Sequence, residues 1–200
     1  MGYGFISGKS MLIQRLQSVV SREQAMRKLS PPGAAGFFRH LTTGKLMGMA
    51  EIYIPYRLSK ILVEDRGEWI TRFLAVDLVA GRLDPLELTK QTLQDQSINI
   101  ETRNHLPVML SDPEAHSVTL AKTRKLLFST GLFRLSQPSL FIETVVPEFY
   151  VPYWIGFLGQ ENNVKILAIN ATRSTLEGSK VAECIQSWLA DRNNPAAHPA

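Results

Sequence analysis

The hexapeptide at residues 51–56 constrains the fold of this chain most, because a close copy of it occurs at residues 148–153. The first copy reads Glu-Ile-Tyr-Ile-Pro-Tyr and the second Glu-Phe-Tyr-Val-Pro-Tyr. The two copies lie about half of the 200-residue chain apart. A sequence that repeats itself at such a distance is typical of a repeated structural unit.

The residues around the two copies also match. Leu74-Ala75-Val76-Asp77 follows the first copy, and Leu167-Ala168-Ile169-Asn170 follows the second. Further on, Leu83-Asp84 corresponds to Leu176-Glu177. The interval after the first copy is four residues longer, and we expect this difference to lie in a hairpin turn, where length changes are tolerated. The alternative is two unrelated hairpins that share a preference for Tyr and Pro.

Hydrophobic spacing and turn residues predict the individual elements. Helices are expected at residues 10–29, 112–130 and 178–190, with a weaker helical pattern at 86–96. Extended segments are expected at 46–63, 69–79, 98–102, 140–146, 148–158 and 164–171. The second helix should begin at Asp112, which would cap it before Pro113. Pro55 cannot donate a ladder hydrogen bond, so it predicts a sheet edge or a bulge.

Together these patterns predict an α+β fold built from two copies of a helix followed by an antiparallel β-hairpin. Repeat units are expected at residues 10–100 and 112–191, within one pseudo-two-fold domain that covers residues 1–200. The helices would pack on an antiparallel sheet. Residues 192–200 are rich in Pro, Ala and Asn and are expected to form a flexible tail.

The composition is that of an ordinary globular protein, with 44% hydrophobic and 20% charged residues. No apolar run approaches the roughly 18–20 residues that a membrane-spanning helix needs, and no signal-peptide pattern is present. Cys184 is the single cysteine, which excludes an intrachain disulfide. We therefore expect a reducing, cytoplasmic setting.

Basic residues concentrate in residues 1–50, where Glu23 is the single acidic residue. The predicted first helix would carry a basic set, which consists of Arg15, Arg22, Arg27 and Lys28. Such a helix is compatible with binding to nucleic acid. A solvated helix face beside an acidic neighbour explains the same residues and is favoured, because charged runs generally lie at the surface.

Glu51 and Glu148 occupy the same position in the two copies. If a pseudo-two-fold axis brought them together, their pKa values would split, which suits acid/base catalysis or a divalent cation. The favoured alternative is that each carboxylate is solvated at the end of a strand. The aromatic residues beside them define a candidate groove for a ligand or partner, although packing in the core is favoured for these side chains. The full candidate groove consists of Glu51, Tyr53, Tyr56, Glu148, Tyr150, Tyr153 and Trp154.

No residue pattern indicates a cofactor or metal site. The four histidines are scattered, no Gly-x-Ser-x-Gly occurs, and the glycines near Gly8 have the wrong spacing for a phosphate loop. The favoured hypothesis is a non-enzymatic binding or interaction module with a groove for a protein or small-molecule partner between the two copies. The alternatives are an enzyme that uses Glu51 and Glu148, and a nucleic-acid-binding protein. The sequence leaves the oligomeric state open.

Overall fold

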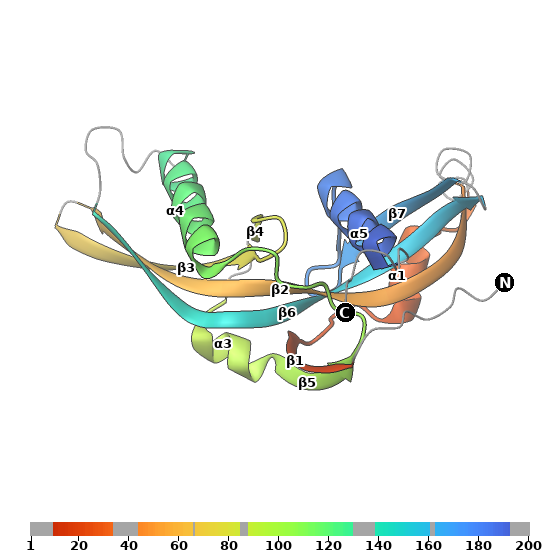
Figure 1. Ribbon diagram of the computed structural model, residues 1–200, viewed down its shortest axis with the longest axis horizontal. Helices are drawn as coiled ribbons and strands as arrows, with labels where there is room; N and C mark the ends of the chain where they lie inside the picture. Colours follow the sequence, from red (N-terminus) through yellow and green to blue (C-terminus); the bar gives the residue numbers. More distant parts are fainter. Residues whose placement is uncertain are drawn as a thin grey trace. The chain divides into compact units, whose positions relative to one another are not determined.

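The computed structural model describes residues 10–33, 44–65, 67–84, 88–129, 139–160 and 163–192. Its strands are β1 Met11–Leu16, β2 Lys45–Asp65, β3 Glu68–Asp77, β4 Leu83–Asp84, β5 Ser97–Thr102, β6 Leu140–Gln160, β7 Asn163–Asn170 and β8 Thr175–Leu176. Its helices are α1 Arg22–Leu29, α3 Lys90–Asp95, α4 Asp112–Ser129 and α5 Ser179–Arg192 (Figure 1). The predicted tail lies largely outside these residues.

The strands form one eight-stranded sheet in the order β4-β3-β2-β6-β1-β5, and β7 pairs with both β6 and β8. The β2/β3, β3/β4, β6/β7 and β7/β8 pairs are all antiparallel. The prediction of an α+β fold with helices and a large, mostly antiparallel sheet is therefore confirmed.

Two compact units divide the chain, and each draws on separate stretches of sequence. Unit 1 contains residues 1–53, 98–106 and 151–200, and unit 2 contains residues 54–97 and 107–150. The chain passes from one unit to the other inside β2, after Tyr53, and inside β6, after Tyr150.

Unit 1 places α1 against the hairpin formed by β6 and β7. Its apolar contact consists of Val20, Ala25 and Leu29 against Ile169 and Ala171. The odd-numbered residues of β7 therefore face α1, because side chains alternate between the two faces of a strand. The even-numbered residues Ile166 and Ala168 face away from α1 and are also buried, and α5 packs on β7.

Unit 2 places α4 against the hairpin formed by β2 and β3. Leu127 packs with Ile61 and Val63, and Leu74, Leu140 and Ile142 surround this contact. The buried side of α4 carries Thr119 and Thr123, whose hydroxyls donate to the carbonyls of Ala115 and Thr119. Those bonds satisfy polar groups that would be costly to bury alone.

Pro55 and Pro152 lie where the pairing of each hairpin ends. The ladder between β2 and β3 stops at Tyr56 and Asp77, and the ladder between β6 and β7 stops at Tyr153 and Asn170. Each proline carbonyl accepts one more bond, from Leu78 and Ala171 respectively. Because proline has no N–H, the reciprocal bond is impossible and the partner strand leaves the ladder.

The carbonyls released in this way have other partners. Leu78 O accepts from the N–H groups of Met109 and Leu110, and Ala171 O accepts from those of Val19 and Val20. β2 itself lies between β3 and β6 and is not an edge strand. The expectation of a sheet edge at Pro55 was therefore wrong for the strand as a whole, although the pairing of β2 with β3 does end there.

The predicted helix over residues 10–29 was also wrong in its first half. Residues 11–16 form β1, and α1 begins only after Ser21, whose side chain forms a capping box with Gln24. The α4 helix does begin at Asp112, but its capping contact comes from Ser111, whose N–H and hydroxyl donate to Glu114. The other predicted elements occur close to their expected positions. Within the residues described, no helix combines the length and the apolar character needed to cross a membrane.

Candidate functional site

Glu51 lies in a cluster of polar side chains within unit 1. Its Oε2 accepts from the Tyr53 hydroxyl at 2.8 Å, and its Oε1 accepts from the Ser18 hydroxyl at 2.9 Å. The Arg15 guanidinium lies 3.9 Å from Oε1 and 5.5 Å from the centre of the Tyr53 ring. Burial, followed by the hydrogen bond to Glu51, raises the pKa of the Tyr53 phenol above its usual range.

Glu148 forms the corresponding contact within unit 2. Its Oε1 accepts from the Tyr150 hydroxyl at 2.6 Å, and burial raises the pKa of this phenol above its usual range, with the Glu148 bond as the next cause. The two carboxylates belong to different units. Each is engaged by the tyrosine two residues after it, so their acid/base role stays a prediction.

The remaining aromatic residues of the candidate groove are buried or partly buried, and each makes a defined polar contact. The Tyr56 hydroxyl donates to Asp84 in unit 2, and the Tyr153 hydroxyl accepts from the Asn170 amide in unit 1. Trp154 Nε1 donates to the carbonyl of Val20 at 2.9 Å, immediately before α1. These contacts hold hairpins and helices together, which agrees with the packing role that the sequence favoured.

The basic set does not lie on one helix. Arg15 is in β1, where it is partly buried beside Glu51, whereas Arg22, Arg27 and Lys28 are exposed on α1. The Lys28 ammonium donates to the carbonyl and hydroxyl of Ser174 in the loop after β7. The expectation of a four-residue basic helix was therefore wrong for Arg15, because residues 11–16 pair as a strand.

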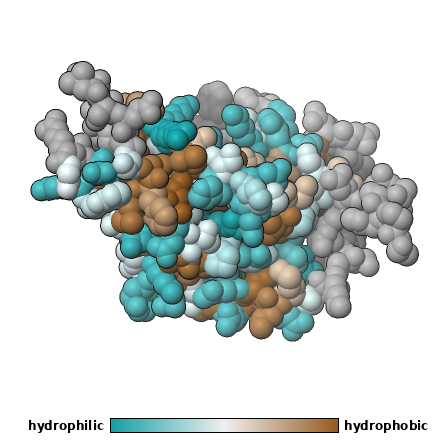
Figure 2. All heavy atoms as spheres, turned by 60° about the vertical axis from the view of Figure 1, so that its left-hand side comes forward, coloured by the Kyte–Doolittle hydropathy of each residue, from teal (hydrophilic) through white to brown (hydrophobic). Residues whose placement is uncertain are grey.

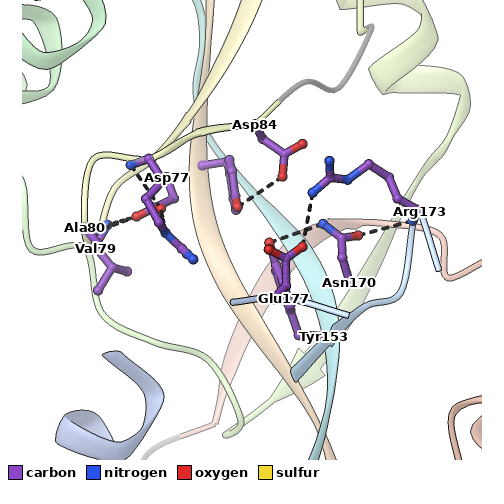
Figure 3. Close-up of polar contacts among 10 residues, drawn as sticks. Asp77, Val79, Ala80, Asp84, Tyr153, Asn170, Arg173 and Glu177 are labelled. Carbon is purple, nitrogen blue, oxygen red and sulfur yellow. Dashed lines mark hydrogen bonds and ion pairs between the residues drawn. The ribbon is translucent and has the colours of Figure 1, made fainter. Parts of the chain in front are cut away.

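Polar loops follow β3 and β7, and the loop in unit 2 is organised by a buried carboxylate. Asp77 accepts from the backbone N–H groups of Val79, Ala80 and Arg82 and from the Arg82 guanidinium (Figure 3). Tyr56 donates to Asp84 at the end of the same loop. All oxygens of Asp77 thus face donors within its own loop, which makes it a structural carboxylate.

The loop in unit 1 has the same plan with an amide at its centre. Asn170 Oδ1 accepts from the N–H groups of Thr172 and Arg173 and from the Thr172 hydroxyl. Figure 3 shows the contact between Asn170 and Arg173. Ser174 adopts a positive φ of 62°, and Gly81 in the other loop has a φ of 64°. The N–H groups of Ser174 and Gly81 each donate to the carbonyl of the residue that begins the loop.

An open apolar face in unit 2 contains residues that the sequence did not single out. Trp69 of β3 is opposite Glu64 of β2, and the N–H of Glu64 donates to the carbonyl of Ser139, which places Ser139 opposite Glu64 on its other side. Phe141 follows two residues later and therefore points to the same face as Trp69. The exposed fractions of Trp69 and Phe141 are 56% and 57%.

This open face is the side of the β2/β3 hairpin that α4 does not cover. The residues packed with Leu127 of α4 have the opposite parity, namely Ile61, Val63, Leu140 and Ile142. In Figure 1, α4 and α3 lie on opposite sides of these strands, and the hairpin continues beyond α3. Figure 2 turns the left-hand side of Figure 1 forward and shows hydrophobic surface among hydrophilic side chains there. We define the open face as Leu62, Trp69, Phe73 and Phe141.

Sequence periodicity alone does not find this face. Leu62 and Trp69 lie in segments that were correctly predicted as extended, but their exposure depends on which helix covers which parity. A useful signal was present in the weak helical pattern of residues 86–96, because a short helix covers little of a long hairpin. Among the residues that the structure describes, no group of three His, Cys, Asp or Glu side chains is arranged to hold a metal ion.

A scan against protein-family models, a search of curated proteins and a search of solved structures each gave no match to this chain.

Proposed function

We propose that this protein is a non-enzymatic interaction module that binds a partner protein on the open face of unit 2. The observation that carries the proposal is the exposure of Trp69 and Phe141, at 56% and 57%, on the sheet face that α4 does not cover, with β2 between their two strands. Large aromatic side chains are enriched among the residues that supply most of the binding energy in protein interfaces. Removing their apolar surface from water when a partner binds contributes favourably to the free energy of binding.

Glu51 of the predicted groove and the buried Asp77, which is outside that groove, support a binding function over catalysis. Glu51 accepts hydrogen bonds through both of its carboxylate oxygens, and the Asp77 carboxylate is filled by donors from its own loop. Such groups are already satisfied in the folded chain, so they stabilise it. A groove shared by two copies, catalysis by Glu51 and Glu148, a role in nucleic-acid binding and a cytoplasmic location stay predictions.

We further propose that the chain consists of two diverged copies that have exchanged their helices. The two hairpins have one register: Tyr56 pairs with Asp77, as Tyr153 pairs with Asn170. Ala75 pairs with Asp84, and the carbonyl of Ala168 accepts from the N–H of Glu177 at the same place. The first hairpin has ten residue pairs and the second has eight, which accounts for the four-residue difference in the sequence.

The exchange is supported by which helix packs on which hairpin. The first-half helix α1 packs on the second-half strand β7, and the second-half helix α4 packs on the first-half strand β3. Each helix begins after a segment whose two N–H groups donate to the partner hairpin, at Val19 and Val20 or at Met109 and Leu110. The two helices thus dock in the same way on the hairpin of the other half.

A random peptide library displayed on phage tests the interaction proposal with the full chain as bait. We expect the wild-type protein to enrich specific peptides, and the double variant Trp69→Ser/Phe141→Ser to lose them, because the anchor side chains are gone. Phe128→Ser is the matched control, since Phe128 is 63% exposed on α4 of the same unit but lies outside the open face. Far-UV circular dichroism would verify that all variants are folded.

If no peptide is enriched, or if the enriched peptides bind the double variant as well as the wild type, the open face is not a protein-binding surface. Equal loss with Phe128→Ser would also contradict the proposal, because it would indicate a general effect of surface hydrophobicity.

A further inference from the structure

One side of the β6/β7 hairpin faces α1, and one side of the β2/β3 hairpin faces α4. The two hairpins differ in the helix that lies on the other side. In unit 1 this side contains Ile166 and Ala168, both buried, and α5 packs on their strand with Val181, Ile185 and Trp188 buried. These three side chains form one apolar stripe, because positions four and seven residues apart lie on the same face of a helix. The hairpin surface in unit 1 therefore accepts an amphipathic helix.

On the equivalent side of unit 2, Figure 1 shows the much shorter helix α3. α3 contains 6 residues and α5 contains 14. At a rise of 1.5 Å per residue, α3 is about 12 Å shorter. The hairpin of unit 2 is also longer, by two residue pairs. Phe73 consequently remains partly exposed, although it occupies the register position at which Ile166 of unit 1 is buried.

We propose that the open face of unit 2 binds an amphipathic helix supplied by a partner protein, in the way that the β6/β7 hairpin binds α5. This inference rests on the proposed function and names its ligand. The partner helix would carry a stripe of large apolar side chains at positions i, i+4 and i+7. Main-chain pairing is not required, because the open face presents side chains and β2 is already paired on both sides.

The charges on the open face specify what flanks that stripe. Glu64 lies between Trp69 and Ser139, and Glu143 lies two residues beyond Phe141 on the same face. Lys60 is on the same face, because it pairs with Phe73, and the register of Glu64 with Ser139 places Lys60 opposite Glu143. The Glu64 carboxylate beside Trp69 favours a partner helix with Lys or Arg next to its apolar stripe, because complementary charges increase the association rate and select the partner.

The sequence of α5 provides a peptide probe, because in this protein it forms a helix with a buried apolar stripe. The probe is a fluorescein-labelled peptide of residues 179–192. It carries Cys184→Ser to prevent oxidation and Glu183→Lys to add a flanking cation. The full chain is titrated into this peptide, and binding is measured by fluorescence anisotropy. We expect saturable binding that weakens with added salt. We also expect Trp69→Glu and Phe141→Glu each to weaken binding at least about tenfold, which is the effect of losing about 1.4 kcal/mol.

Matched controls separate helix recognition from nonspecific adhesion. Phe128→Ser in the protein should leave the affinity unchanged, because Phe128 is on α4. In the peptide, Ile185→Pro should abolish binding, since proline breaks the helix, and Ile185→Asp should do so by removing the middle of the stripe. Glu64→Gln should weaken binding of the Lys-containing peptide more than binding of the peptide that retains Glu183.

The outcomes distinguish this inference from the proposed function. No saturable binding of the peptide, or binding that the Trp69 and Phe141 variants leave unchanged, overturns the helix proposal. If the phage library nevertheless gives peptides that depend on Trp69 and bind in an extended conformation, the interaction module stands and its ligand is a strand. If neither experiment gives binding that depends on Trp69, both proposals are wrong.

Discussion

At the scale of single residues, Tyr53 and Tyr150 are buried phenols that donate to the carboxylates of Glu51 and Glu148. The sequence identified all four residues by their repetition, but it could not show their contacts. Side chains two apart on a strand point to the same face, which allows each tyrosine to bind the glutamate of its own strand. The repeated glutamates are thus hydrogen-bond acceptors within their own units.

These phenols predict a loss of stability at alkaline pH. The pKa of each tyrosine is higher in the folded protein than the unperturbed value of about 10 in the unfolded chain, so the unfolded state loses its protons first as the pH rises. The stability that these tyrosines contribute is full below about pH 10 and decreases as the pH rises above that value. Urea unfolding at pH 8 and pH 11 would measure this decrease.

The variants Tyr53→Phe and Tyr150→Phe should each reduce that alkaline decrease, although both will lower stability at pH 8 by removing a hydrogen bond. Ultraviolet titration at 295 nm should show that each substitution removes one phenol that ionises above the ordinary tyrosine range. An equal alkaline decrease in the wild type and both variants would contradict the assignment.

At the scale of elements, the sequence predicted strands and helices well where the spacing of hydrophobic residues fitted only one type of secondary structure. The patterns of residues 46–63, 164–171 and 178–190 correspond to β2, β7 and α5. The prediction was wrong at residues 10–29, where Ile13 and Leu16 are buried in a strand although their spacing also fits a helix. Ser21 and Gln24 form a capping box at the start of α1, and this sequence pattern predicts the correct helix start.

The packing of α1 on β6 gives a prediction at this scale. A methyl group added at Gly156 would lie 2.8 Å from Leu29 Cδ1, whereas one added at Gly48 would lie 3.9 Å from Phe157. We expect Gly156→Ala to destabilise the protein by about 1–3 kcal/mol, because Leu29 is fully buried and must move. Gly48→Ala should be neutral or slightly stabilising, because alanine loses less entropy than glycine on folding.

Thermal or urea unfolding of the two variants measures the difference, and both glycines lie in strands of unit 1, so intrinsic propensity is matched. Equal stabilities of the two variants would mean that α1 is not held tightly against β6.

At the scale of the whole molecule, the sequence predicted a fold from two similar halves but not the way in which the halves contribute to the units. Each compact unit takes residues from both halves, and β2 and β6 each belong to both units. Hydrophobic periodicity describes local faces and carries no information on which distant face covers them. For the same reason, the periodicity of β2 and β3 does not predict which of their faces is left open.

The shared strands predict that the two units unfold together. Asp77→Ala is a substitution in unit 2, and Gly156→Ala is one in unit 1. Both should shift one common unfolding transition. The reason is that β2 and β6 cannot unfold in one unit without disturbing the other. Single-tryptophan variants that retain Trp69 or Trp154 would report unit 2 and unit 1 separately during urea unfolding. Two transitions with different midpoints would show that the units are independent.

The division of the chain also has a consequence for its synthesis. Unit 2 contains no residue beyond 150, whereas unit 1 combines β1 and α1 with β7 and α5, which come after residue 150. At about 5–20 residues per second, α1 and β1 wait several seconds after unit 2 is complete before β7 and α5 have been made. Val20, which precedes α1, and Leu29 of α1 pack with Ile169 and Ala171. During synthesis these two residues therefore lack their apolar partners until β7 has been made, and chaperones or other nascent chains can reach them.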